Sequence, residues 1–367
     1  MRFALVDFGS HVVFYDYYLA RGMIELGHQV LYFGSETKFN NEYLVALRNE
    51  KGCSVVSKPV SRSVSSCWRG FFAYLSLVWD VWHRRNEYDR VNLQFCTIWP
   101  VEIILFWLLR KKFIYTVHNA VPHDFSGNSY WPFRLLAHLA EEIWFPSEAT
   151  AESFYHRYSQ SFRSKGKVVQ VGTMGAYPAC ILSPYKLQKQ IEGVAYWSNI
   201  KPYKGIELML DLIRRRAAFK GNDVIEVYGL WSKELRPIRD EIRLLNGHVE
   251  DRFLSSDELT LLLSRDLVFL LPYKSASQSG ALYTLLHHGR LFMATDVGDL
   301  GAFLRRFGLE GLILEDATVE SVDQCMAWLN VNLPYAIARF TAAQSELSWS
   351  NSLLAAGIGR GEEVAGQ

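Results

Sequence analysis

Two short polar segments carry the residue types that could bind a phosphate. One runs from Lys201 to Gly205, contains two lysines, and follows an apolar run from Val194 to Trp197. The other runs from Tyr273 to Gly280, is rich in serine, and follows an apolar run from Leu267 to Leu271. Each pattern predicts a strand, a turn and a helix, and a helix start presents unpaired N–H groups and a partial positive charge. Two such turns in one open α/β domain indicate a single diphosphate held between them.

Lys204, beside Gly205 at a helix start, is the first candidate for the phosphate contact, and Lys201 is the second. Ser279 offers a hydroxyl and an N–H group, and Gly280 allows a close approach. Further candidates for the same surface are Tyr273, Ser277, Gln278 and Gly229. The alternative is a pair of ordinary loops, in which Lys201 is a solvated surface lysine.

A third group of polar residues follows a strand expected at Phe113 to Val117. His118, His123 and Asp124 lie at its carboxyl end, where ligands bind in open α/β sheets. A carboxylate there could take a proton from a hydroxyl group, and we choose Asp124 for this role and His123 as the substitute. Asp124 could instead be a turn or cap residue after Pro122, and either histidine could belong to the core.

The surrounding pattern alternates strands and helices, which predicts parallel sheets covered by helices. Strands are expected in the first half at Arg2–Phe8, Gln29–Phe33, Cys53–Pro59, Tyr88–Phe95, Phe113–Val117, Trp144–Pro146 and Lys167–Gly172. Strands are expected in the second half at Val194–Trp197, Val224–Tyr228, Leu267–Leu271, Leu291–Thr295 and Gly311–Leu314. Helices are expected to close the chain at Val319–Asn330 and from Tyr335 to about Leu354. The opening lacks the full dinucleotide glycine fingerprint, which disfavours a nicotinamide enzyme.

Three segments resemble nucleotide-sugar glycosyltransferases of the GT-B fold. NIKPYKGIELML resembles their phosphate-binding turn, and LPYKSASQSG with the later ATDVGDL is similar to their second donor-binding unit. TVHNAVPHDF resembles a segment in the acceptor-side domain of bacterial exopolysaccharide transferases.

The resemblance implies an α/β chain with two Rossmann-like domains that face each other across a cleft. We expect an acceptor-binding domain at 1–180, a linker at 181–192, a donor-binding domain at 193–334, and a segment at 335–367 whose helix crosses back. The resemblance also implies that the loop with Gly9 and Ser10 faces the cleft. It further implies that Phe253 lies by the nucleobase and that His118 contacts the donor sugar. A tight turn would explain Gly9 equally well.

The resemblance further implies sugar transfer from a UDP- or GDP-linked donor to a glycan acceptor, which we expect to be lipid-linked, in bacterial surface or exopolysaccharide synthesis. Many retaining members carry two glutamates eight residues apart in the second unit, and these positions are Ala276 and Thr284 here. We therefore predict an inverting reaction with Asp124 as the base. The alternatives are a retaining transferase assisted by the donor phosphate, a non-catalytic sugar-binding subunit, and an epimerase of similar fold.

Bulk composition limits the other classes of function. The net charge of +1 gives no overall attraction to nucleic acid, and the apolar fraction of 49% is that of a globular protein. The five cysteines are scattered and show no metal-site spacing, so we expect neither a metal nor another cofactor besides the nucleotide-sugar substrate. Buried thiols of this kind are typical of a reducing cytoplasm.

The segment from Ser66 to Lys112 joins aromatic helices to basic ends. It contains WRGFFAYLSLVWDVWHRR and IWPVEIILFWLLRKK, and residues 62 to 112 have eight basic and four acidic side chains. This pattern suits the surface of an anionic membrane, so we expect peripheral attachment at the cytoplasmic face. The alternative is that both helices flank the sheet and use their basic ends to complement their dipoles. The N-terminus reads as a strand and not as a signal peptide.

Overall fold

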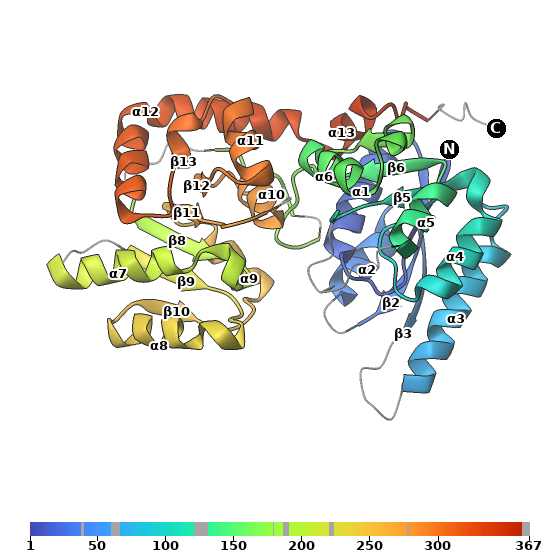
Figure 1. Cartoon of the computed structure of the whole chain (residues 1–367), viewed down its shortest axis with the longest axis horizontal. Coiled ribbons are helices and arrows are strands. Elements are labelled where there is room, and N and C mark those ends of the chain that lie inside the picture. The colour runs from blue at the N-terminus through green and yellow to red at the C-terminus, as the bar shows by residue number, and fades with distance from the viewer. Residues whose placement is uncertain are drawn as a thin grey trace. The chain divides into compact units, whose positions relative to one another are not determined.

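The computed structural model describes residues 1–37, 40–59, 67–120, 131–178, 180–185, 191–219, 224–276 and 279–361. The chain divides into two compact units (Figure 1). The first contains residues 1–172, 177–179 and 347–367, and the second contains 173–176 and 180–346. The C-terminal segment therefore belongs to the same unit as the N-terminus.

The first unit is built on one sheet of seven parallel strands in the order β3-β2-β1-β4-β5-β6-β7. These strands are β1 Arg2–Asp7, β2 Gln29–Glu36, β3 Cys53–Pro59, β4 Arg90–Leu93, β5 Phe113–Thr116, β6 Glu142–Phe145 and β7 Gly166–Val168. The strand order reverses between β1 and β4, which makes the carboxyl ends of these two strands the expected ligand-binding point of the unit.

Helices cover both faces of this sheet. They are α1 Val13–Glu25, α2 Asn41–Asn49, α3 Cys67–His83, α4 Trp99–Leu108, α5 Trp131–Leu139, α6 Glu148–Tyr158 and α13 Trp349–Ala355. Ala4, Val6 and Phe8 point into a core shared with α3 to α6. Asp7 points to the opposite face because side chains alternate along a strand, and α1 lies there with α2 and α13 beside it. Burial on both faces explains the nearly continuous apolar runs of these strands.

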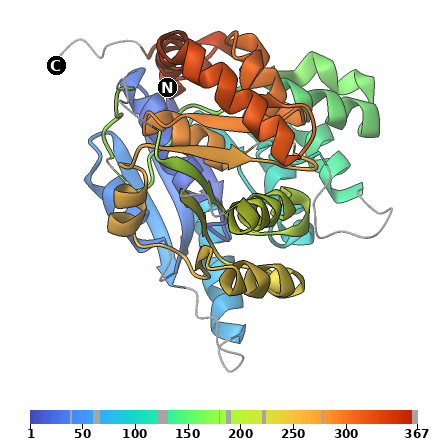
Figure 2. The same ribbon diagram turned by 90° about the vertical axis from the view of Figure 1, so that its left-hand side faces the viewer.

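The second unit repeats this architecture with six parallel strands in the order β10-β9-β8-β11-β12-β13. They are β8 Gly193–Trp197, β9 Val224–Tyr228, β10 His248–Glu250, β11 Leu267–Leu271, β12 Phe292–Thr295 and β13 Ile313–Leu314. The helices are α7 Glu207–Phe219, α8 Arg236–Leu244, α9 Ser256–Leu262, α10 Gly280–His287, α11 Gly298–Arg306 and α12 Val319–Glu346. Helices α7 and α8 lie side by side (Figures 1 and 2). Strand order reverses between β8 and β11, which are the strands that precede the two polar turns.

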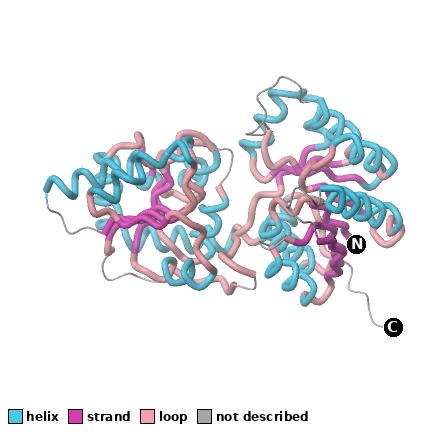
Figure 3. The backbone as a smooth tube through the Cα atoms, turned by 90° about the horizontal axis from the view of Figure 1, so that it is seen from below, coloured by secondary structure: helices cyan, strands magenta, loops and turns pink. Residues whose placement is uncertain are grey.

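Helices enclose the strands of each unit (Figure 3), and the predicted fold of two Rossmann-like α/β domains is confirmed. The sequence did not predict β10, which has only three residues. The expected final helix is also different. Helix α12 runs to Glu346 with non-helical angles at Asn332, just before Pro334, and Figure 1 shows it as two segments at an angle. Proline cannot donate the helical hydrogen bond, which explains a kink at this point.

Candidate active site

Lys204 lies at the strand-order reversal of the second unit. It ends the turn after β8, and its Nζ donates hydrogen bonds to the hydroxyls of Ser198 and, at 3.3 Å, Tyr273. The same ammonium group lies 4.9 Å from the centroid of the Tyr273 ring. Among the described residues no carboxylate forms an ion pair with Lys204, so neutral hydroxyls and an aromatic ring hold a half-buried positive charge. Such a charge is available to an anion.

The two polar turns are in direct contact with each other. Gly205 has a φ of +67°, and a Cβ at this position would collide with the carbonyl oxygen of Pro272. The backbone N–H of Lys274 donates to the carbonyl oxygen of Tyr203 at 2.7 Å, and the Nζ of Lys274 pairs with Glu207 at 2.7 Å. Only glycine tolerates both this φ and this distance, so Gly205 is required for the two turns to meet.

Ser279 completes the group from the second turn. It is buried at the N-cap of α10, and its hydroxyl donates to the Tyr273 hydroxyl at 3.4 Å. Its side chain makes no cap hydrogen bond, while Gly280 begins the helix with its first N–H groups at the same end. Ser277 and Gln278 lie outside the described residues. The structure thus brings Lys204, Tyr273 and Ser279 together, as expected if they share one ligand.

The other donor-site candidates lie at the carboxyl ends of neighbouring strands. Gly229 directly follows β9 and has a φ of +141°. Its N–H donates to the backbone carbonyl oxygen of Glu250 at 3.0 Å. Phe253 follows β10, and 61% of its surface is exposed. Lys201 is exposed, and its carbonyl oxygen accepts a hydrogen bond from the N–H of Lys204 at 2.9 Å. Phe253 and Lys201 are therefore accessible, but the structure does not join their side chains to the Lys204 group.

In the first unit, His118 is buried at the carboxyl end of β5. Its Nε2 donates to Gln94 Oε1 at 3.0 Å, and its ring stacks on Phe95 with centroids 4.6 Å apart. Tyr15 meets the other side of the ring edge-on at 4.7 Å. Burial lowers the pKa of His118 to about 3, so the imidazole is neutral at physiological pH. A neutral ring that donates to an amide oxygen suits hydrogen bonding to a ligand better than proton transfer.

The loop after β1 is tightly held. Ser10 has a φ of +47°, its hydroxyl donates to the carbonyl oxygen of Ser35 at 2.8 Å, and it accepts from the N–H of Ser35 at 2.9 Å. A Cβ at Gly9 would collide with the ring of His11. These bonds show a structural use for the Ser10 hydroxyl, and they fix the loop at the strand-order reversal of the first unit.

Sequence reasoning missed several residues of these two groups. Ser198 directly follows β8, and its hydroxyl accepts a hydrogen bond from Lys204. Its place after the strand could have marked it as a site residue in the sequence. Asp7 and Asp16 form a buried acidic pair on the α1 face of the first sheet, and no apparent pattern in the sequence links them. Burial raises the pKa of Asp7 to about 6. His123 and Asp124 lie outside the described residues.

No group of metal-ligating side chains is present among the described residues. None of the helices in the described part of the chain is both long enough and apolar enough to cross a bilayer.

Solved structures of other proteins resemble this chain over nearly its whole length. HepE of Anabaena, in a crystal structure with UDP and glucose, matches with a TM-score of 0.65 and 15% identity over 97% of both chains. Sucrose-phosphate synthase of Thermosynechococcus elongatus matches with a TM-score of 0.66 and 13% identity over 97% of both chains. WaaG, a glycosyltransferase involved in lipopolysaccharide biosynthesis, matches with a TM-score of 0.57 and 12% identity over 97% of this chain and all of WaaG. No curated protein matches the chain in sequence.

The fold is thus the GT-B fold, as the resemblance implied. The model of Glycosyltransferase Family 4 matches residues 12–170, and these residues make up most of the first unit. The first unit is therefore similar in sequence to the glycosyltransferases of this family, and the whole chain shares their fold with the solved structures. This favours a transferase over the non-catalytic subunit and the epimerase.

The family match argues against one detail of the predicted reaction. Enzymes of Glycosyltransferase Family 4 retain the anomeric configuration of the transferred sugar, whereas we predicted inversion with Asp124 as the base. The prediction rested on the missing glutamate pair. Ala276 and Thr284 do stand at those positions, and Thr284 is buried in α10.

Proposed function

We propose that this enzyme transfers a sugar from a UDP-sugar to a lipid-linked glycan with retention of anomeric configuration, in the synthesis of a bacterial surface polysaccharide. The observation that carries the proposal is the half-buried Lys204 ammonium at the strand-order reversal of the second unit. The complex of HepE with UDP and glucose supports the choice of nucleotide, and the role of WaaG supports the choice of pathway.

In this proposal the diphosphate of the donor lies against Lys204, the Ser279 hydroxyl and the first N–H groups of α10. Negative charge grows on the diphosphate as the bond to the sugar breaks, so a fixed cation and a helix start stabilise the transition state more than the ground state. The hydroxyls of Ser198 and Tyr273 hold the ammonium group in place before the donor arrives. Lys201 and Gly229 contribute to the rim of this site, and Phe253 lies against the nucleobase.

In this proposal the acceptor oxygen attacks the sugar from the face that the diphosphate leaves, which retains the anomeric configuration. The bond between the anomeric carbon and the phosphate oxygen breaks, and the bond to the acceptor oxygen forms on the same side. The acceptor proton passes to the departing phosphate oxygen, so no protein base is needed. His118, neutral at working pH, gives its one N–H group to Gln94 and can accept a hydrogen bond from a sugar hydroxyl through Nδ1.

The acceptor and the location follow from the first unit. Exposed aromatic side chains on α3 and α4 include Trp68, Phe72, Trp79 and Trp107. Aromatic side chains beside lysines and arginines favour the headgroup region of an anionic bilayer. We therefore place the enzyme peripherally at the cytoplasmic face of the membrane, where a lipid-linked acceptor is within reach.

A thermal-shift series tests the donor site. UDP and its sugar conjugates are expected to raise the melting temperature more than the GDP, ADP and TDP series does, because only bound ligand stabilises the folded state. Lys204→Ala is expected to weaken UDP binding about 10- to 100-fold, as loss of a charge-assisted contact should. Lys233→Ala, an exposed lysine of the same unit, serves as the matched control. Unchanged UDP affinity in Lys204→Ala would contradict the site, and the anomer of the product, followed by NMR, tests retention separately.

A further inference from the structure

Helix α3 has two apolar stripes, one fully buried in the core and one only partly packed against it. Tyr74, Leu77 and Val81 are buried against the first sheet. A second stripe follows the spacing i, i+3, i+4, i+7, which places its members on one face of a helix. Its members are Leu75, Val78, Trp79 and Trp82.

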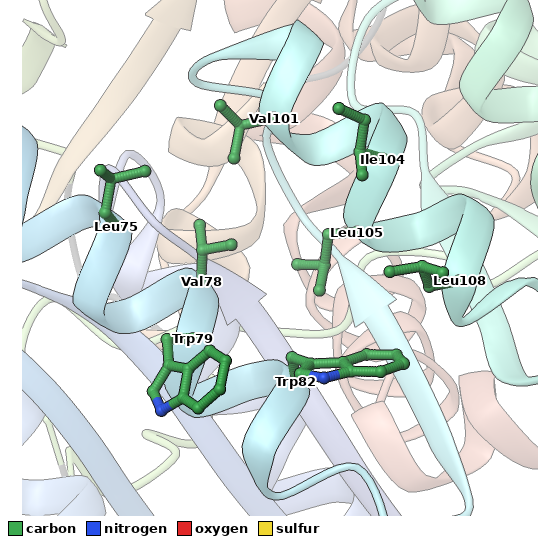
Figure 4. Close-up of a pocket in the computed structure, with 8 residues that line it drawn as sticks. All are labelled: Leu75, Val78, Trp79, Trp82, Val101, Ile104, Leu105 and Leu108. Atoms are coloured by element: carbon green, nitrogen blue, oxygen red, sulfur yellow. The ribbon is translucent and has the colours of Figure 1, made fainter.

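Helix α4 presents a matching stripe with the same spacing. Its members are Val101, Ile104, Leu105 and Leu108. The two stripes face each other in Figure 4 and line a groove of about 290 Å³ in which every lining residue is apolar. Trp79 and Ile104 are 61% and 62% exposed, so the described part of the chain leaves the groove open. An open apolar groove of this size is characteristic of a binding surface.

Arg85 follows the end of α3 beside Trp82, which lines the groove, and Arg110 follows the end of α4. Helices α3 and α4 both connect parallel strands, so they run in the same direction and end at the same side. The guanidinium of Arg85 lies 4.3 Å from the ring of Trp82, and that of Arg110 lies 5.5 Å from the ring of Trp107. Each donates to the carbonyl oxygen of its tryptophan, at 3.1 and 3.2 Å, and neither forms an ion pair within the described residues. By contrast, the nearby Arg84 pairs with Glu87 at 2.6 Å.

These features define the chemistry of an occupant. An apolar groove whose two helices are each followed by an arginine complements a single hydrocarbon chain that carries a phosphate. Adsorption to a flat bilayer needs only exposed apolar side chains. A groove between two helices, by contrast, can remove a single hydrocarbon chain from water along its length. A protein helix would leave the two guanidinium groups without a counter-charge unless it brought a carboxylate.

We propose that the α3–α4 groove binds the hydrocarbon chain of the acceptor's lipid carrier, and that Arg85 and Arg110 bind its phosphate. This inference rests on the proposed function, because it gives the acceptor its chemical class. It adds a second, separate ligand site to the enzyme, in the first unit and built from residues that take no part in donor binding.

Decyl phosphate, kept below its aggregation concentration, is a suitable probe for the full chain by titration calorimetry. Saturable binding of one molecule per chain is expected. Val78→Trp fills the groove and is expected to weaken binding about tenfold or more, whereas adsorption to phosphatidylglycerol vesicles should persist because the apolar surface remains. Leu244→Trp, at an exposed site of α8, is the matched control. The double variant Arg85→Gln, Arg110→Gln should weaken decyl phosphate but not decanol.

Three results would overturn the proposal. One is equal decyl phosphate affinity in wild type and in Val78→Trp. Another is binding to vesicles with none to decyl phosphate, which would mean bilayer adsorption alone. The third is a dimer that Val78→Trp dissociates, which would make a second copy the occupant. If thermal unfolding shows that Val78→Trp is misfolded, Ile104→Ser, at an exposed position, replaces it with the same expectation.

The same preparations separate this proposal from the proposed function. A UDP-induced thermal shift without decyl phosphate binding would reject the groove and leave the donor site standing. Decyl phosphate binding without a UDP shift would reject the donor site alone.

Discussion

At the scale of single residues, the chemistry depends on where charge is held without a partner of opposite charge. Lys204 is half-buried among the hydroxyls of Ser198 and Tyr273, whereas Lys201, three residues earlier, is exposed. A flexible exposed lysine is solvated and gives little binding free energy, while an ammonium group already fixed in place loses less entropy when an anion arrives. Both lysines have the same residue type, so their surroundings decide their roles.

His118 makes a residue-scale prediction about pH. Its pKa is about 3 in the folded chain and near 6.5 when unfolded, so the neutral form stabilises the fold. As the pH falls below 6.5, His118 binds a proton in the unfolded chain but stays neutral in the folded chain. The free energy of unfolding therefore decreases toward pH 3. His118→Gln keeps a hydrogen-bonding side chain but does not titrate.

We expect the loss of stability between pH 6.5 and about 4 to be smaller in His118→Gln than in wild type, as measured by urea unfolding. His156→Gln, an exposed histidine of the same unit, should follow the wild type. Parallel pH profiles for wild type and His118→Gln would show that His118 is not buried as a neutral group.

At the scale of elements, the proposed donor site depends on the contact between the turns after β8 and β11. That contact needs a glycine at position 205, because of its positive φ and the nearby carbonyl oxygen of Pro272. The helices that follow the turns then start close together, which brings their N–H groups and Lys204 to one place.

Gly205→Ala should therefore lower stability and donor binding together. The left-handed conformation costs about 1–2 kcal/mol for a residue with a Cβ, and the collision with Pro272 adds to this. Differential scanning calorimetry should show a lower melting temperature for the second unit, with UDP binding weakened in the same variant. Gly359→Ala, where a Cβ would meet nothing, is the control. Wild-type UDP affinity in Gly205→Ala would show that the turns need not touch.

At the scale of the whole molecule, the chain begins and ends in the same unit. Helix α13 packs on α1, where Trp349 meets Tyr15 edge-on at 4.8 Å and sits against Gly22. The first unit is therefore complete only after residues 347 onward have been added, although its whole sheet is made from the first 170 residues.

Trp349→Ala should destabilise the first unit by about 3–5 kcal/mol, since it removes a large buried side chain and leaves a cavity. Trp68→Ala, at a 74% exposed position of α3, should change stability by less than about 0.5 kcal/mol. Denaturant unfolding followed by circular dichroism measures both. The UDP-induced stabilisation should survive in Trp349→Ala, because the donor site is in the other unit, and equal stability of the two variants would contradict the role of α13.

Much of this protein was readable from its sequence, because strand and helix patterns are local. The apolar runs at Arg2–Asp7 and Leu267–Leu271 are buried on both faces of a sheet, and such runs are recognisable without knowing their neighbours. The turn with Lys204 and Gly205 was predicted for the same reason, since it occupies a strand-to-helix junction. The short strand β10 was missed because three residues carry no periodicity.

The tertiary structure alone decided which of these parts meet. Lys204 and Tyr273 are 69 positions apart, and their contact exists because β8 and β11 are neighbours at the strand-order reversal. The same holds for His118 and Gln94, which lie on neighbouring strands of the first sheet. It also decided that one apolar stripe of α3 is fully buried while the second is only partly covered, since a doubly apolar helix predicts burial on both sides. Periodicity is a property of neighbours along the chain, whereas a site is made by neighbours in space.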